Sequence, residues 1–276
     1  MITIRTELHA LRHRPGPKLM VVVWSAQIIV FAYLISYLIY RFVPHLTTAQ
    51  AAQIHRGLLP AQLDNQLLYS MPVYGGPVML IIGALVGGGD YRWGTLRTIV
   101  ARRPDRIGFV LGRAGALTVV MLLTSVSSLV ISGICSTIVA LADHDPAAWP
   151  PLPSLLLHLL AFWLVCAAWA MAGFALAVLT RSVTAAIGIG LMWTLALENV
   201  IGLLSSSVPV LAGVRKGLLS AATGSLAKAM GGPGAVTGAP GVAPVLGGSL
   251  AVVVLLGYIA LGIGVSAVAF TRRDIA

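Results

Sequence analysis

The sequence predicts an all-α, polytopic membrane protein with six transmembrane helices. Of its 276 residues, 58% are hydrophobic and 9% are charged, whereas a soluble domain carries roughly a quarter charged residues. The mean hydropathy is +0.94, and six apolar runs reach the roughly 20 residues that a helix needs to cross a bilayer. These features exclude a soluble enzyme, a disordered chain and a nucleic-acid-binding domain. We therefore expect no nucleic acid among the partners, despite the net charge of +10.

The six predicted spans make residues 1–276 a single transmembrane domain. The first apolar run is longer than the core of a signal peptide, and no small-x-small cleavage site follows it, so we expect a true span there. Gly75, Gly76 and Pro77 predict a kinked start to the second span. The connections are too short for a separate soluble domain. The predicted spans cover residues 19–40, 69–89, 114–142, 154–180, 183–204 and 245–270.

Lys and Arg residues are distributed unevenly between the two sides of these spans. Thirteen of the 18 lie in the amino-terminal segment, in the connections after the second and fourth spans, and in the carboxyl-terminal tail, while five lie in the other connections. Cytoplasmic loops carry an excess of Lys and Arg. The sequence therefore predicts a multi-pass protein of the cell membrane with both termini in the cytoplasm.

Three segments outside the predicted spans carry informative patterns. Residues 1–18 predict an amphipathic helix in the membrane interface, with Ile4, Leu8 and Leu11 on one face, although a merely basic tail remains an alternative. Between the first two spans, leucines at 58, 59, 63 and 67 have the spacing of another amphipathic helix. The long outer connection, 205–244, begins with an apolar part that we expect to re-enter the membrane and ends in a Gly- and Pro-rich loop.

The chain lacks the sequence signals of an enzyme. It contains no G-x-x-x-x-G-K-[ST] loop for nucleotide phosphates, no H-E-x-x-H, no C-x-x-C and no G-x-S-x-G motif. Asp143, His144 and Asp145 could contact a metal, but adjacent residues point in different directions, so we expect a solvated turn and no metal. We expect neither a catalytic site nor a cofactor on this chain.

The connection between the second and third spans, 90–113, is the most informative stretch. The span ends at an acidic residue, a short basic helix is expected to begin near Gly94, and Pro104 is expected to stop it. Leu96, Ile99 and Val100 would form one apolar face among arginines. Such a helix can anchor to anionic headgroups or dock into a soluble partner. Its candidate residues are Asp90, Gly94, Thr95, Leu96, Arg97, Ile99, Val100, Pro104 and Arg106.

These residues resemble the permease subunits of type-2 ABC transporters. That family has an acidic residue, then a Gly-Thr-Leu-Arg quartet four positions later, and a Pro-x-Arg soon after. Asp90, residues 94–97 and residues 104–106 match, except that the family usually has Glu in place of Asp90. The basic amphipathic amino terminus, the six spans and the Leu-Glu-Asn run at 197–199 extend the resemblance over most of the chain.

The resemblance implies the membrane-spanning subunit of an ATP-driven exporter. The short helix would be a coupling helix, which fits a cleft on a separate ATPase subunit. ATP and Mg would be bound by that ATPase, which acts as a dimer, and not by this chain. A second permease chain, the same or homologous, would complete the pore, and membrane lipids would surround it.

Glu198 is the only acidic residue well inside a predicted span. Thr194 lies one turn before it, and we group both with Asn199 as candidate gate or translocation residues. The carboxylate either bonds to a neighbouring helix end or to Arg215 or Lys216, which would hold an outer gate closed, or it contacts a cationic substrate; we favour the gate. Two other functions remain open, an ion-coupled secondary transporter that uses Glu198 and a membrane scaffold without transport.

Two further features of the spans have packing interpretations. Serines 125, 128, 132 and 136 form a stripe on the third span, which we assign to close helix packing in preference to a polar path. His158, near the outer end of the fourth span, is expected to lie in the interface.

Overall fold

The computed structural model describes residues 4–44, 46–92, 106–205, 207–231 and 241–272. All regular elements in these ranges are helices, and six of the helical segments are long and apolar enough to cross a membrane. This confirms the all-α fold and the prediction of six candidate spans. The six segments are Pro15–Phe42, Pro60–Tyr91, Ile107–Ala142, Leu152–Thr180, Val183–Leu204 and Gly248–Arg272.

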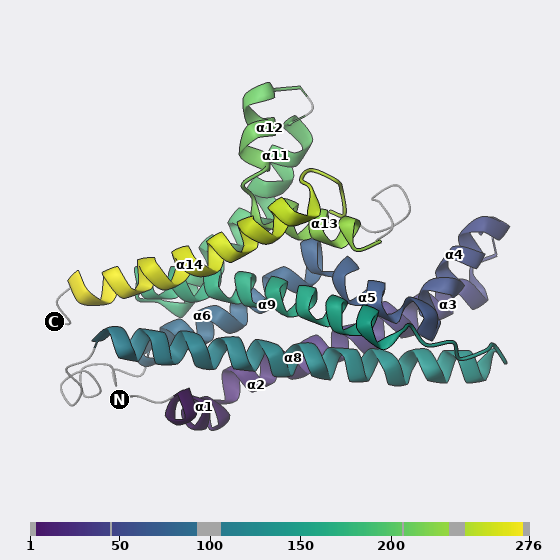
Figure 1. The fold of residues 1–276 in the computed structure, drawn as a ribbon, viewed down its shortest axis with the longest axis horizontal. Helices are drawn as coiled ribbons and strands as arrows, with labels where there is room; N and C mark the ends of the chain where they lie inside the picture. The colour runs from purple at the N-terminus through teal and green to yellow at the C-terminus, as the bar shows by residue number, and fades with distance from the viewer. Residues whose placement is uncertain (1–3, 45, 93–105, 206, 232–240, 273–276) are drawn as a thin grey trace.

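The first span follows a short helix that lies across one end of the bundle. Helix α1 (Ile4–Arg12) stops where Pro15 begins α2, because proline is accepted in the first helical turn but not further inside a helix. The span continues from α2 (Pro15–Gln27) through a π-helical stretch, η1 (Ile28–Ile35), into α3 (Ser36–Phe42). Figure 1 shows α1 end-on beneath α8, at the same end of the bundle as the carboxyl-terminal end of α14. We call the end of the bundle where α1 lies and α14 finishes the terminal end.

The predicted helix through leucines 58, 59, 63 and 67 is interrupted. Helix α4 (Thr48–Leu58) begins with a capping box made by Thr47 and Gln50. It ends before Pro60, where the backbone of Leu59 becomes extended. A 3-10 turn, η2 (Pro60–Gln62), and the short helix α5 (Leu63–Tyr69) follow. The second span then passes through a π-helical turn, η3 (Met71–Gly75), into α6 (Gly76–Arg92), so it begins earlier than the sequence predicted.

The centre of the molecule is the packing of α6 against α9 (Leu152–Thr180). Gly83 and Gly173 lie where the two backbones touch: a Cβ at Gly83 would overlap the carbonyl of Ala170, and a Cβ at Gly173 would overlap that of Leu80. Small residues allow membrane helices to approach this closely. The long helix α8 (Arg106–Ala142) lies along the other side of α9, so the second and fourth spans form the buried core of the bundle.

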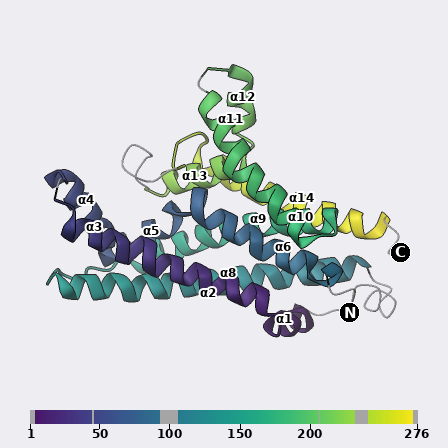
Figure 2. The same cartoon turned by 180° about the vertical axis from the view of Figure 1, so that it is seen from behind.

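The fifth span leaves the bundle. It runs through α10 (Val183–Leu191), η4 (Met192–Leu197) and α11 (Glu198–Leu204), and both views show it rising away from α8 toward α12 (Pro209–Arg215) (Figures 1 and 2). Most of its large apolar side chains are exposed. The chain then returns through α13 (Leu219–Ala229), which packs against α9 and the last span, α14 (Gly248–Arg272).

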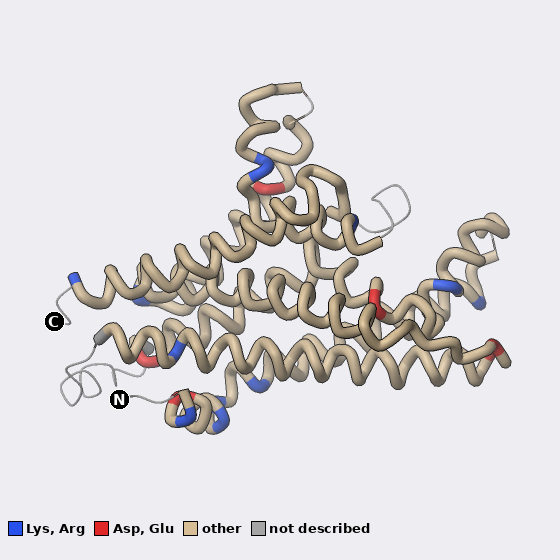
Figure 3. Tube along the Cα trace, viewed as in Figure 1, with Lys and Arg blue, Asp and Glu red and all other residues tan. Residues whose placement is uncertain are grey.

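Charged residues gather at the two ends of the bundle. Figure 3 shows them around α1 at the terminal end and, at the opposite end, around α4 and the turn that follows α8. We call the end of the bundle that contains α4 and the turn after α8 the far end. A third group surrounds α11 and α13. These three places contain the candidate sites.

Candidate functional sites

A buried ion-pair network joins four helices at the terminal end. Asp90, near the end of α6, is 1% exposed and binds both Arg14, which precedes α2, and Arg113 in the first turns of α8. Arg113 also donates from Nε to Glu7 Oε2 of α1 at 3.3 Å. Two carboxylates therefore face two guanidinium groups, which compensates charges that would be costly to bury singly. We call Glu7, Arg14, Asp90 and Arg113 the terminal network.

Local packing holds the two arginines of this network. The Arg113 guanidinium lies 4.6 Å from the centre of the Phe109 ring, one turn earlier on the same helix. Arg14 lies over Gly89, where a Cβ would come within 2.7 Å of Arg14 Nη1. The absence of a side chain at position 89 thus leaves room for Arg14 to reach Asp90.

The coupling motif itself lies mostly outside the described residues. Gly94, Thr95, Leu96, Arg97, Ile99, Val100 and Pro104 all fall in the segment 93–105, and Arg106 begins α8. Asp90 is the motif member whose side chain the structure describes, and its carboxylate forms the ion pairs with Arg14 and Arg113. Sequence reasoning missed Glu7, although it is the only acidic residue among the first 18 and shares a helix face with the buried Leu11.

Glu198 binds the beginning of a neighbouring helix. Its side chain is buried, with 4% of the residue exposed. Oε1 accepts a hydrogen bond from Trp193 Nε1 at 3.1 Å, and Oε2 accepts one from the backbone N–H of Ser220 at 3.0 Å. Ser220 lies in the first turn of α13, where backbone N–H groups have no partner inside the helix and favour an anion. The sequence left two kinds of partner open for Glu198, a neighbouring helix end or the basic residues Arg215 and Lys216. In the structure the carboxylate bonds to a helix end, the start of α13. Arg215 instead donates to Ser205 Oγ at 3.1 Å.

The two other gate candidates take different places. Thr194 is buried near Glu198 and donates to the carbonyl of Leu191 at 3.4 Å. Asn199 is exposed and donates to the carbonyl of Leu195 at 2.7 Å, so the described contacts do not bring it to the Glu198 carboxylate. Helix α13 is also held by Trp169 of α9, whose Nε1 donates to Thr223 Oγ1 at 3.0 Å.

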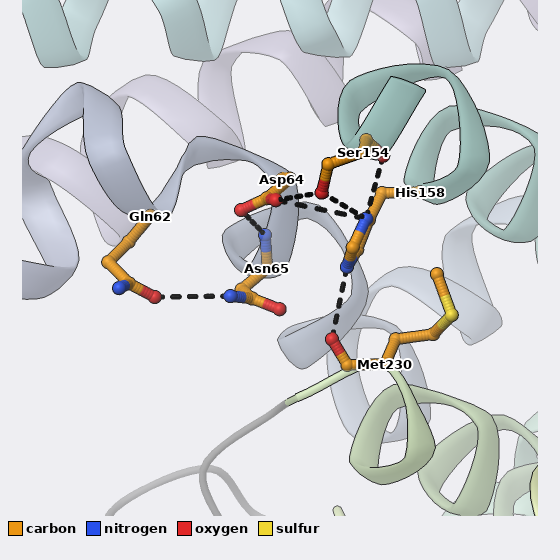
Figure 4. Close-up of polar contacts among 6 residues, drawn as sticks. All are labelled: Gln62, Asp64, Asn65, Ser154, His158 and Met230. Atoms are coloured by element: carbon orange, nitrogen blue, oxygen red, sulfur yellow. Dashed lines mark hydrogen bonds and ion pairs between the residues drawn. The ribbon is translucent and has the colours of Figure 1, made fainter. Parts of the chain in front are cut away.

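His158, near the start of α9, is buried between helices. It is 7% exposed, and its ring lies between two backbone carbonyls, with Nδ1 2.8 Å from Ser154 O and Nε2 3.0 Å from Met230 O. Ser154 Oγ also donates to Asp64 Oδ2 at 2.7 Å. Figure 4 shows that this cluster joins α5, α9 and the end of α13. The cluster thereby connects α13, the helix that binds Glu198, to the core. Sequence reasoning did not identify it, because its residues are far apart along the chain.

The serine stripe of α8 is buried, as the packing interpretation requires. Ser125, Ser128 and Ser136 donate to carbonyls of their own helix at 2.7 to 3.0 Å, and Ser128 accepts a hydrogen bond from Trp24 Nε1 at 2.9 Å. The bond from Trp24 holds α2 against α8.

The turn after α8 differs from the expected solvated turn. His144 adopts a left-handed backbone conformation with φ of 57°. The carboxylates of its two neighbours, Asp143 and Asp145, both reach the imidazole of His55 in α4, with oxygens 3.1 and 3.2 Å from Nε2. The expectation that adjacent residues point apart is therefore wrong for the two aspartates, because the reversed backbone at His144 turns them toward the same histidine. His144 itself is exposed.

Comparisons with known proteins give a family but no activity. A family model described as "Protein of unknown function (DUF2705)" matches residues 19–276. No curated protein matches the chain. The matched range includes Asp90, Arg113 and Glu198.

Proposed function

We propose that this chain, which belongs to the DUF2705 family, is the membrane-spanning permease subunit of an ATP-driven exporter. A separate ATPase dimer would bind ATP and Mg, and segment 93–105 would carry the coupling helix that docks into it. In this proposal the protein is not itself an enzyme. It lies in the cell membrane with the terminal end in the cytoplasm.

The observation that carries the proposal is the terminal network. Asp90 and Arg113, at the two ends of the coupling segment, bind each other, and Arg14 and Glu7 tie them to the first span and to α1. A displacement of the segment would therefore act on α6 and α8 together. A loop that served only to connect two helices would not need three buried charges and a partly exposed arginine paired at its base, because each buried charge is costly unless it is paired.

The exposed fifth span supports a paired assembly. Its apolar side chains are mostly exposed, and one segment of it carries the buried Glu198 bound to α13. A second permease chain placed against this span would line a path between the two copies. Glu198 would then hold α13 in the closed arrangement of the gate.

Copurification tests the proposal. The full chain, tagged and extracted from its own cells in mild detergent, should retain an ATPase subunit that has a nucleotide-binding loop. Leu96→Asp should abolish this association, because a docked apolar face would leave the new carboxylate desolvated. Leu96→Met is the matched control and should keep the association, since it conserves volume and polarity.

Two results would contradict the proposal. One is retention of the ATPase by Leu96→Asp at the wild-type level. The other is transport by the reconstituted chain alone, driven by an ion gradient, which would favour a secondary transporter.

A further inference from the structure

Three side chains at the far end place their ligand atoms in one small cluster. His55 Nε2 lies 3.1 Å from Asp143 Oδ2 and 3.2 Å from Asp145 Oδ2, and all three atoms lie within 4.8 Å of one another. His55 comes from α4, while the aspartates come from the turn after α8, 88 residues later in the chain. This cluster, which we call the far-end triad, is separate from the terminal network and from Glu198.

Neighbouring aromatic residues orient the triad. The ring of Tyr40 stacks on that of His55, with centroids 4.6 Å apart and an angle of 21° between the planes. Tyr37 donates from its hydroxyl to Asp143 Oδ1 at 3.0 Å. Arg41, which is half exposed, lies 3.6 Å from the same oxygen. The second oxygen of Asp143 is therefore the one directed toward His55. Such outer hydrogen bonds to ligating carboxylates and fixed imidazole rings are typical of metal sites.

The spacing of the triad fits a small divalent cation. Zinc bonds to histidine nitrogen and carboxylate oxygen at about 2.0–2.2 Å, which places tetrahedral ligands roughly 3.4 Å apart. The two separations from His55 are already close to that value. A single hydrogen on Nε2 would have to be shared between the two carboxylates, whereas a divalent cation bonds to all three groups and neutralises both negative charges.

We propose that the far-end triad is a binding site for Zn²⁺. One imidazole and two carboxylates suit zinc or a similar transition metal better than Ca²⁺ or Mg²⁺, which prefer oxygen ligands alone. Three protein ligands leave a fourth position for water. The bound ion would fix α4 to the turn between the third and fourth spans. The proposal does not depend on the transport function.

Metal titration of the purified full chain tests this site. The protein carries an affinity tag without histidine, is stripped with a chelator, and is titrated with Zn²⁺ in competition with a chromophoric chelator. We expect saturable binding of one ion per chain. His55→Ala and Asp145→Asn should each remove it. Tyr37→Phe, which loses the hydrogen bond to Asp143, should weaken it about tenfold.

His144→Ala is the matched control, because this exposed histidine lies between the two aspartates and is not part of the triad. It should bind Zn²⁺ as the wild type does. Asp145 is partly exposed, so Asp145→Asn tests the site with little risk to folding. The proposal is overturned if the wild type shows no saturable binding, or if both His55→Ala and Asp145→Asn bind with wild-type affinity. Loss of binding in His144→Ala would also overturn it.

Discussion

Glu198 shows how one side chain inside an apolar span acquires a defined partner. An acidic group at the centre of a membrane helix costs about 2.5–3.5 kcal/mol on insertion scales. The backbone N–H of Ser220 and the indole of Trp193 offset part of this cost by donating to the two oxygens. Hydrogen bonds to an ionised carboxylate are stronger than those between neutral groups. The same bonds fix the start of α13 to the fifth span.

We expect Glu198→Gln to loosen α13. The amide keeps the shape of the side chain but removes the charge, and hydrogen bonds to charged groups contribute about 1.5–3 kcal/mol. Amide hydrogen exchange should therefore become faster in the first turns of α13. If Glu198 is a gate, transport of every substrate should also change and uncoupled ATPase activity should rise. Trp193→Phe removes one donor only and should have a smaller effect. Exchange at the wild-type rate in Glu198→Gln would contradict the anchoring role, and selective loss of cationic substrates would favour substrate binding.

At the scale of helices, the packing of α6 on α9 depends on glycine. Each helix places a glycine against a backbone carbonyl of the other, at Gly83 and at Gly173. The apolar run of a span is visible in the sequence, but the partner of each glycine is set only by the approach of two helices. Sequence reasoning noted the glycines at the start of the second span and did not identify this contact.

We expect Gly173→Ala to destabilise the bundle. The new methyl group would overlap the carbonyl of Leu80, and because the obstacle is backbone, the two helices would have to separate. Overpacking of this kind costs roughly 1–3 kcal/mol or more, which should appear as a lower melting temperature in detergent. Gly257→Ala in α14 is the matched control, since no atom lies within 4 Å of the added Cβ. Equal melting temperatures for the two variants would contradict this account of the α6–α9 contact.

For the whole molecule, the arrangement of the spans predicts which positions share a side of the membrane. Helix α1 and the carboxyl-terminal end of α14 lie at the terminal end, whereas α4 and the turn after α8 lie at the far end (Figures 1 and 2). The excess of Lys and Arg in the connections assigned to the terminal end favours the cytoplasm for that end.

Single cysteines should report this arrangement. Cys135 and Cys166 are first replaced by alanine, since both lie inside spans. Arg12→Cys and His144→Cys, at exposed positions of the two ends, should then react with a membrane-impermeant thiol reagent from opposite sides, with Arg12→Cys reacting from the cytoplasm. Reaction of both from the same side would contradict the topology.

The sequence alone determined the class of the protein and the approximate spans. Crossing a bilayer depends on the length of an apolar run, which is a local property of the chain, and all six runs are candidate spans in the structure. The beginning of α2 at Pro15 is also a local property, because proline is accepted in the first turn of a helix. The break at Pro60 was missed, because the leucine spacing was given more weight than the proline that interrupts it.

Only the tertiary structure decided which charged groups meet. Glu7 and Arg113 are 106 residues apart, and His55 and Asp143 are 88 residues apart. No periodicity in one sequence pairs residues at such distances, because the pairing depends on the order and angle in which the helices pack. Asp90 and Glu198 could be selected from the sequence because a carboxylate next to or inside an apolar run is costly without a partner. Their partners, Arg14, Arg113 and the backbone of Ser220, became identifiable only when the helices that carry them were placed side by side.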